Sequence, residues 1–324
     1  MTDIVVSPVD GLPEIGPGDD LAGLISARLD GPLRAYDTVV VTSKVVSKAA
    51  GLVTTADRES LIDAATDRLV ARKGRTRIVR THGGLTMAAA GLDASNTKPG
   101  TVVSLPPDPD ASAARLRTEL QALHPAAQPL GVVVTDTAGR AWRVGQTDIA
   151  IGCAGIWPAR SYQGESDAYG NELAVTAPAI ADEIASAAEI ATGKTSGRPV
   201  ALVRGLDATV FCPDEGPGAR ALVRPEGEDL FGLGANEAVS RAVATSPERP
   251  RGFADIDSDP IAVALGAVDP AVLTVDATSA DVSVSIAAGA DRDDALLALG
   301  ALRERIRILD RAYGTHHEVH VRDL

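Results

Sequence analysis

VVVTDTAGRAWRVGQTDIAIG, residues 132–152, is the stretch from which our interpretation of the fold begins. Its apolar start, followed by Thr-Asp-Thr, predicts a buried strand that delivers Asp136 and two hydroxyl groups to its C-terminal edge. Gly139 allows a tight turn, and a second apolar segment then carries the chain back into the core. A carboxylate, hydroxyls and the guanidinium groups of Arg140 and Arg143 together suit a metal ion that holds phosphate. For this turn alone, a strand with an Asp-capped turn and a solvated arginine pair is the simpler interpretation.

A second segment, LTMAAAGLDASN at residues 85–96, favours the interpretation as a metal site. Its small residues let the backbone approach a ligand or a neighbouring strand closely, and it ends in Asp93, Ser95 and Asn96. If the two strand ends meet, Asp93 and Asp136 can share one hard cation such as Mg²⁺ or Mn²⁺. Whether they meet depends on the tertiary structure.

The composition bounds the class of protein. With 324 residues the chain exceeds a typical single domain, so we expect one large domain and a smaller one. A formal net charge of −13 argues against a nucleic-acid partner, because phosphate backbones need clustered lysine and arginine. Two cysteines, Cys153 and Cys212, are too few for a disulfide framework or a cysteine metal site. The start of the chain lacks a signal-peptide pattern and no long apolar stretch follows, which predicts a cytoplasmic protein with no membrane partner.

Strands and helices alternate irregularly along most of the chain. Periodicity and turn signals predict strands at 4–9, 38–42 and 200–205, a hairpin of 76–81 with 85–90, and helices after Asp19 or Asp20, at 61–72, after 106–110 and at 179–191. Because the pattern lacks a regular βαβ alternation, it predicts an α+β fold with a mixed sheet. The strand at 38–42 runs directly into Ser43, Lys44 and Lys48, an arrangement that suits phosphate, although many strand-to-helix turns look the same.

Gly193, Lys194 and Thr195 are similar to the end of a phosphate-binding P-loop. That motif requires a glycine five residues before its Gly-Lys pair and a strand leading into it. Position 188 is Ala188, and the segment leading in is predicted to be helical. We therefore reject a P-loop here.

The composition shifts at residues 246–252, SPERPRG, and this shift predicts a linker. It would separate a large domain at 1–245 from a small C-terminal α/β appendage at 253–324. We assign no chemical role to the appendage.

The appendage has the periodicity of a small α/β unit. A strand, an amphipathic helix and a last strand are predicted at 282–286, 291–312 and 318–321. His316, Glu318 and His320 would share one side of that last strand and offer ligand atoms for a metal ion. An exposed terminal strand is the simpler explanation of these three residues.

Six motifs occur along the first part of the chain. They are GLPEI at 11–15, the segment 39–48, AGLDASN at 90–96, TDTAGR at 135–140, DAYGNEL at 167–173 and VRGL at 203–206. In this order and spacing they resemble the coenzyme F420-0:L-glutamate ligases, also called F420 γ-glutamyl ligases, in which F420 is a deazaflavin coenzyme. Chance agreement at one motif is easy, but at all six it is not. The resemblance implies the mixed-sheet ligase domain of that family.

The resemblance also implies a reaction. Members of that family join L-glutamate to coenzyme F420-0 through an amide bond, with GTP converted to GDP and phosphate, and some add further γ-linked glutamates. It implies Mg²⁺ or Mn²⁺, K⁺ as a monovalent ion, and an intertwined homodimer.

The family's functional positions carry over residue by residue. Nucleotide contacts would fall on Leu12, Pro13, Glu14, Ile15, Ser43, Lys44, Lys48 and Asn96. Asp93 and Asp136 would bind the first metal ion, and Thr137 would bind a second. Lys194 stands where one family member has an acidic ligand to the second ion, which puts that ion in doubt.

The residue types fit this chemistry. A carboxylate does not condense with an amine in water, so the γ-phosphoryl group of GTP would first form an acyl phosphate that the glutamate amine attacks. Phosphoryl transfer requires alignment and charge neutralisation. We expect catalytic contributions from Asp93, Asp136, Lys48 and Arg140.

Two other functions remain open from the sequence. A metal-dependent GTP phosphohydrolase could use the same carboxylates, and a non-catalytic module could bind a nucleotide or a deazaflavin. Some bacterial relatives carry a flavin-binding nitroreductase-like domain, for which the roughly 75 residues after the linker are too few. No flavin is therefore expected.

Overall fold

The structure, a computed structural model, describes residues 3–95, 97–225, 228–229, 231–234, 238, 264–266, 268–278, 281–313 and 315–322. The chain divides into two compact units, Met1–Leu69 with Lys73–Val223 and Val70–Arg72 with Arg224–Leu324. The linker predicted at 246–252 lies outside the described residues, as does residue 245, the predicted end of the large domain.

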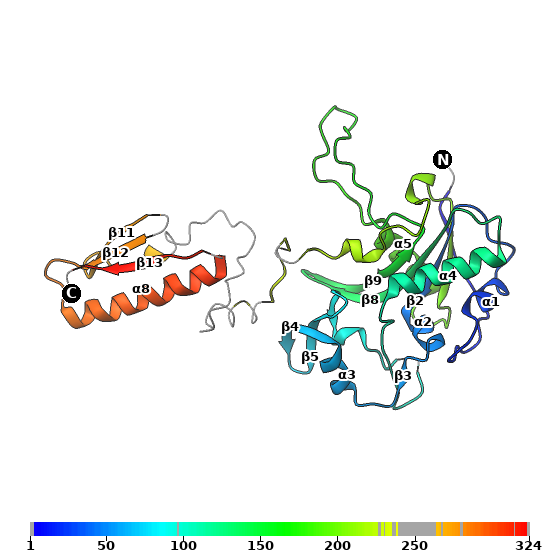
Figure 1. Ribbon diagram of the computed structural model, residues 1–324, viewed down its shortest axis with the longest axis horizontal. Helices are drawn as coiled ribbons and strands as arrows, with labels where there is room; N and C mark the ends of the chain where they lie inside the picture. Colours follow the sequence, from blue (N-terminus) through cyan, green and yellow to red (C-terminus); the bar gives the residue numbers. More distant parts are fainter. Residues whose placement is uncertain are drawn as a thin grey trace. The chain divides into compact units, whose positions relative to one another are not determined.

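The first unit is built on a five-stranded mixed sheet with the order β1-β10-β2-β8-β9 (Figure 1). Its strands are β1 (Val5–Pro8), β10 (Val200–Arg204), β2 (Asp37–Thr42), β8 (Leu130–Arg140) and β9 (Arg143–Ala154). β2 and β8 run parallel, whereas the other neighbouring pairs are antiparallel. The central strands are runs of valine and leucine because both of their faces are buried, and they lie where the apolar runs predicted them.

Helices cover both faces of this sheet. The covering helices are α1 (Leu21–Ser26), α2 (Ser43–Ala49) and α4 (Pro109–Leu123) on one face and α5 (Ile180–Thr192) on the other. Each face of the sheet has its own hydrophobic core, and alternate residues of β8 point into one or the other. Val132 and Val134 pack with α1 and α4, while Val133 packs with α5. The mixture of helices with mixed sheets is consistent with the predicted α+β class. This alternation also decides which face each polar residue at the end of β8 can reach.

The helix predicted at 61–72 is confirmed over 61–65 and is wrong beyond. α3 (Arg58–Ala65) ends early, and the chain continues as β4 (Thr66–Lys73), which is in a three-stranded sheet with β5 (Thr76–Thr81) and β6 (Thr86–Ala88). In α3 only Ile62 is buried, so a longer helix would have no core to cover. From Thr66 onward, exposure alternates with the period of a strand. The predicted hairpin of β5 and β6 is confirmed.

The hairpin of β8 and β9 turns later than the sequence predicted. β8 does not end at Thr137 but continues to Arg140, and the turn lies at 141–142 rather than at Gly139. Gly139 lies within the ladder, opposite Gln146. The continued pairing satisfies backbone groups that an earlier turn would leave to solvent, and this outweighs the turn preference of one glycine.

Short elements connect this sheet to the polar residues of interest. They are η1 (Ala89–Gly91), the two-stranded sheet of β3 (Val53–Thr54) and β7 (Val102–Val103), η2 (Ala208–Val210) and η3 (Ala219–Leu222). Asp20, one of the two predicted candidates, caps α1 by accepting the Gly23 amide. Asp108 likewise caps α4, which begins at Pro109, within the segment 106–110 where a helix start was predicted.

The second unit has its own core. β11 (Leu273–Ala277), β12 (Asp281–Ile286) and β13 (Glu318–Val321) form a three-stranded sheet, and α8 (Arg292–Tyr313) packs its apolar face on them. The predicted strands and amphipathic helix of the appendage are confirmed. In the described part of the chain, no helix is both long and apolar enough to cross a membrane.

Candidate active site

Ser43 and Asp136 come together where the parallel pairing of β2 with β8 ends. Thr42 at the end of β2 is the register partner of Thr135 in β8. The residues that follow them, Ser43 and Asp136, therefore lie at the same level of the sheet. The Ser43 hydroxyl donates to Asp136 Oδ1 over 3.3 Å. Ser43 is also the first residue of α2, which begins directly after β2.

Asp136 is a carboxylate whose negative charge is poorly compensated. Burial raises its pKa to about 6, and repulsion from the charges of Asp148 and Asp93 acts in the same direction. Hydrogen bonds from the Thr137 amide and the Ser43 hydroxyl oppose this rise without cancelling it. A cation beside Asp136 would relieve the cost of keeping this group ionised.

Asp93 is held by its own loop and by a lysine. Its backbone bridges Val103 through two hydrogen bonds, and its carboxylate accepts the Ser95 amide over 2.6 Å. Lys44 Nζ lies 2.6 Å from Asp93 Oδ2 and also donates to the Ser95 carbonyl. Burial alone would raise the pKa of Asp93, but the bonds from Lys44 and Ser95 hold it below the ordinary value.

Two consecutive residues at the start of α2 therefore connect the two acids. Ser43 contacts Asp136 and Lys44 contacts Asp93. The electrostatic repulsion between Asp93 and Asp136 shows that they share one polar region. The two residues predicted as ligands of the first metal ion are thus linked through Ser43 and Lys44, and their carboxylate oxygens are ligands that Mg²⁺ and Mn²⁺ favour.

Lys48 lies one turn further along α2. Its ammonium is 2.5 Å from Glu14 Oε1, and its side chain is mostly buried while Glu14 is exposed. Among the predicted nucleotide contacts at 12–15, the Ile15 side chain is buried in the core with α1 and α4, whereas Pro13 and Glu14 are exposed. Pro13 and Glu14 can therefore present side chains to a ligand, whereas Ile15 can offer only its backbone.

Thr137 belongs to the opposite face of β8 from Asp136, because adjacent residues of a strand point to opposite sides. Its hydroxyl donates to Asp148 Oδ1 over 2.6 Å and accepts from the Lys194 ammonium. Thr137 and Asp148 are direct register partners in β8 and β9. The predicted second metal ligand is thus engaged in a side-chain network with a lysine.

Arg140 is not placed beside the two acids. Arg140 donates to the Val144 carbonyl at the turn of the hairpin. It is four residues beyond Asp136 along an extended strand, a separation of roughly 13 Å at about 3.3 Å per residue. Asn96 lies outside the described residues.

Asp148 and Glu189 are polar residues of this region that were not predicted from the sequence. Asp148 is buried and accepts from the hydroxyls of Thr135 and Thr137, and Glu189 of α5 accepts the Asp148 amide over 3.0 Å. The Thr-Asp pair at 147–148, just before the returning apolar segment, mirrors Thr135 and Asp136. That internal similarity was the available signal.

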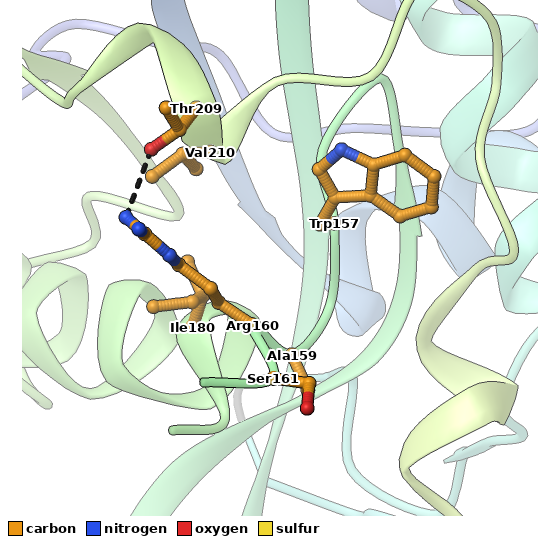
Figure 2. Close-up of a pocket in the computed structure, with 7 residues that line it drawn as sticks. All are labelled: Trp157, Ala159, Arg160, Ser161, Ile180, Thr209 and Val210. Atoms are coloured by element: carbon orange, nitrogen blue, oxygen red, sulfur yellow. Dashed lines mark hydrogen bonds between the residues drawn. The ribbon is translucent and has the colours of Figure 1, made fainter. Parts of the chain in front are cut away.

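A separate cavity of about 320 Å³ opens beside the segment that follows β9. Figure 2 shows its lining residues, Trp157, Ala159, Arg160, Ser161, Ile180, Thr209 and Val210. The Arg160 guanidinium donates to the Thr209 hydroxyl over 3.1 Å and lies 4.5 Å from the centre of the Tyr162 ring. None of the predicted site residues that the structure describes lines this cavity.

In the second unit, Glu318 and His320 lie near each other as predicted, and Asp281 of β12 joins them. His320 Nε2 is 3.2 Å from Asp281 Oδ1, and all three side chains are exposed. His316 is not part of this group. An exposed ion pair between neighbouring strands accounts for the arrangement.

Where β2 and β8 stop pairing, the carboxylate of Asp136 and the lysines of α2 gather in an arrangement that suits a cation and an anionic substrate. The profile of the F420-0:gamma-glutamyl ligase family matches residues 11–205 of this chain. The chain belongs to that family, which confirms the resemblance of its motifs.

Three relatives that the chain resembles are each named coenzyme F420:L-glutamate ligase. The protein from Methanopyrus kandleri is 35% identical over 249 residues, covering 70% of this chain and 96% of the relative. The protein from Archaeoglobus fulgidus is 35% identical over 253 residues, covering 70% and 96%. The protein from Halobacterium salinarum is 39% identical over 224 residues, covering 60% and 85%.

Proposed function

We propose that this protein is a GTP-dependent ligase that forms an amide bond between L-glutamate and coenzyme F420-0 in the biosynthesis of coenzyme F420. Membership of the family and the names of its relatives support glutamate ligation. The single observation that carries the chemistry is the pair of Asp93 and Asp136 at the start of α2, with the charge of Asp136 left largely uncompensated.

The acid pair fits one divalent cation, Mg²⁺ or Mn²⁺, bound between Asp93 and Asp136. Such an ion would neutralise the phosphate charge of the nucleotide when bound. A K⁺ ion would complete the set of cations implied by the family. The protein's own cations, Lys44 and Lys48, lie on the same short helix and would bind phosphate oxygens.

The proposed reaction has two steps. A carboxylate oxygen of F420-0 attacks the γ-phosphorus of GTP, the bond to the β-γ bridging oxygen breaks, and GDP leaves. The amine of L-glutamate then attacks the acyl carbon, phosphate leaves, and the amine loses a proton as the amide forms. Alignment and charge neutralisation dominate the first step, which is why lysines and carboxylates surround it.

The nucleotide would lie along α2 and the 12–15 loop, with contacts from Leu12 to Ile15, Ser43, Lys44 and Lys48. Asn96 and Arg140 stay predictions for this site. Apolar side chains are exposed at the hairpin turn and on α5, namely Trp142, Val144 and Ile190, and contact with a second copy of the chain would bury them. They support a homodimer, whose mass light scattering can measure.

Phosphate release from GTP tests this function against its alternatives. For the ligase, release in the presence of Mn²⁺ depends on both F420-0 and L-glutamate, and mass spectrometry shows F420-0 gaining a glutamyl residue. Release without either co-substrate identifies a GTP phosphohydrolase. No release, with nucleotide still bound, identifies a binding module.

A further inference from the structure

The ammonium group of Lys194 lies among three side-chain oxygen atoms. Its ammonium donates to the Thr137 hydroxyl, lies 3.2 Å from Glu189 Oε1 and lies 3.8 Å from Asp148 Oδ1. Lys194 follows directly after Gly193, the C-terminal cap of α5. The three acceptors come from β8, α5 and β9, so residues distant in sequence form this cluster.

The oxygen cluster is fixed by bonds that do not involve Lys194. Asp148 has a side chain that is 8% exposed, and it accepts from the Thr135 hydroxyl over 3.1 Å and the Thr137 hydroxyl over 2.6 Å. Glu189 uses its other oxygen to accept the Asp148 amide over 3.0 Å. A cluster held in this way keeps its shape when the lysine is changed.

Two carboxylates and a hydroxyl are hard oxygen donors, which is the ligand set of Mg²⁺, Mn²⁺ or K⁺ rather than of a soft metal. Two buried or partly buried carboxylates without a cation would also repel each other. Lysine carries a compact charge with three donors, and here it supplies the charge that the cluster needs. The ammonium stands where a metal ion would have to stand to reach Thr137, so the residues present do not fit a second free metal ion.

We propose that Lys194 is a built-in cation, whose ammonium fills the oxygen cluster of Thr137, Asp148 and Glu189 and excludes a free metal ion from it. Asp136 of the first cation site lies on the other face of β8, away from this cluster. The inference rests on the proposed function only for its catalytic meaning, namely that this enzyme works with one free divalent ion per active site.

The test counts bound Mn²⁺ in the full chain by electron paramagnetic resonance of the free ion, without GTP, F420-0 or glutamate. Lys194→Ala and Lys194→Gln are each expected to bind one more Mn²⁺ per chain than the unmodified protein. Lys194→Arg, which keeps the charge, and Lys73→Ala, which removes an exposed lysine elsewhere, are expected to bind the same number as the unmodified protein. The double change Lys194→Ala with Glu189→Gln removes a ligand and should abolish the gain.

A second measurement tests whether the oxygen cluster, once Lys194 is removed, binds K⁺ rather than Mn²⁺. The melting temperature of Lys194→Ala should rise in KCl above its value in tetramethylammonium chloride of equal ionic strength, whereas that of the unmodified protein should not. Gain of either ion supports the proposal.

Two outcomes would overturn it. If Lys194→Ala and Lys194→Gln remain folded by circular dichroism and gain neither ion, the proposal is wrong. It is equally wrong if GTP binding weakens with no new ion, because Lys194 would then be a phosphate ligand. The ion count is made without substrates. A failure of the Lys194 proposal can therefore be distinguished from a failure of the proposed ligase activity.

Discussion

At the scale of single residues, the ionised form of Asp136 destabilises the folded protein, because its charge is buried among other acids. The charges of Asp93 and Asp148 both act on Asp136; in the described contacts, Asp93 is paired with Lys44 and Asp148 with Lys194, whereas Asp136 has no ion pair. A metal ion or a proton relieves this cost. Function at this site is therefore coupled to stability through one carboxylate.

Asp136→Asn is expected to stabilise the metal-free protein at pH 7.5. The pKa of Asp136 is about 6 in the folded chain against 3.8 in the unfolded one, so the folded state holds a proton more tightly. The penalty for ionisation is fully present above pH 6, is lost as the pH falls through this window, and is absent below 3.8. The gap corresponds to an upper value of about 3 kcal/mol in the free energy of unfolding. Urea unfolding in EDTA measures it, and Mn²⁺ should stabilise the unmodified protein but not the variant. Equal stability of the two proteins at pH 7.5 would contradict this account.

Lys48→Ala is expected to lower kcat/KM for GTP by about 10²-fold or more, because a positioned cation on the transferred phosphoryl group is lost. Steady-state phosphate release with F420-0 and glutamate measures this value. Lys73→Ala is the control, since it removes an exposed lysine that lies outside the site. Unchanged GTP turnover in Lys48→Ala would assign the lysine a structural role.

At the scale of elements, the hairpin of β8 and β9 decides the geometry of both polar clusters. Register partners in it place Thr137 opposite Asp148, and strand alternation sends Asp136 and Thr137 to opposite faces. β9 also packs closely against the start of α4, so its position is set by packing as well as by pairing. A change at that contact should disturb the whole hairpin.

Gly152→Ala tests that contact. A Cβ atom at position 152 would lie 2.3 Å from both the carbonyl carbon and the oxygen of Pro109, which are backbone atoms that cannot move alone. We expect a loss of about 1–3 kcal/mol in the free energy of unfolding, measured by urea titration. Gly139→Ala in the same hairpin meets nothing within 4 Å and should change stability by less than about 0.5 kcal/mol. If the two variants lost the same stability, close packing of β9 on α4 would not be the cause.

At the scale of the whole molecule, the chain has two units with separate cores. The described residues of the candidate active site all belong to the first unit, while α8 and its sheet form the second. Damage to the second core should therefore leave the chemistry intact at temperatures where the first unit stays folded.

Leu302→Ala is the corresponding test. Leu302 is fully buried between α8 and the small sheet, and truncating such a residue costs about 2–5 kcal/mol. Calorimetry should show one unfolding transition shifted downward, with glutamate ligation at 25 °C within twofold of the unmodified protein. The exposed Leu297→Ala on the same helix is the control and should shift neither transition. Loss of ligation in Leu302→Ala alone would tie the second unit to catalysis.

The sequence by itself determined the local and linear features of this protein. Valine runs specified the central strands, the segments 19–20 and 106–110 marked two helix starts, and the ordered motifs specified the family. These features are encoded within a few neighbouring residues, so reading along the chain suffices. Local signals misled where a helix and a strand were both compatible, as at 61–72, and where pairing overrode the turn preference of Gly139.

Only the tertiary structure decided which polar residues meet. The pairing of Thr137 with Asp148, the arrival of Glu189 and Lys194 from another element, and the approach of Asp93 to Asp136 all join residues far apart in the chain. Such contacts depend on strand register and on helix packing over the sheet, which no local pattern encodes. For that reason the residue types of the site were predictable from its motifs, whereas its division between two faces of β8 was not.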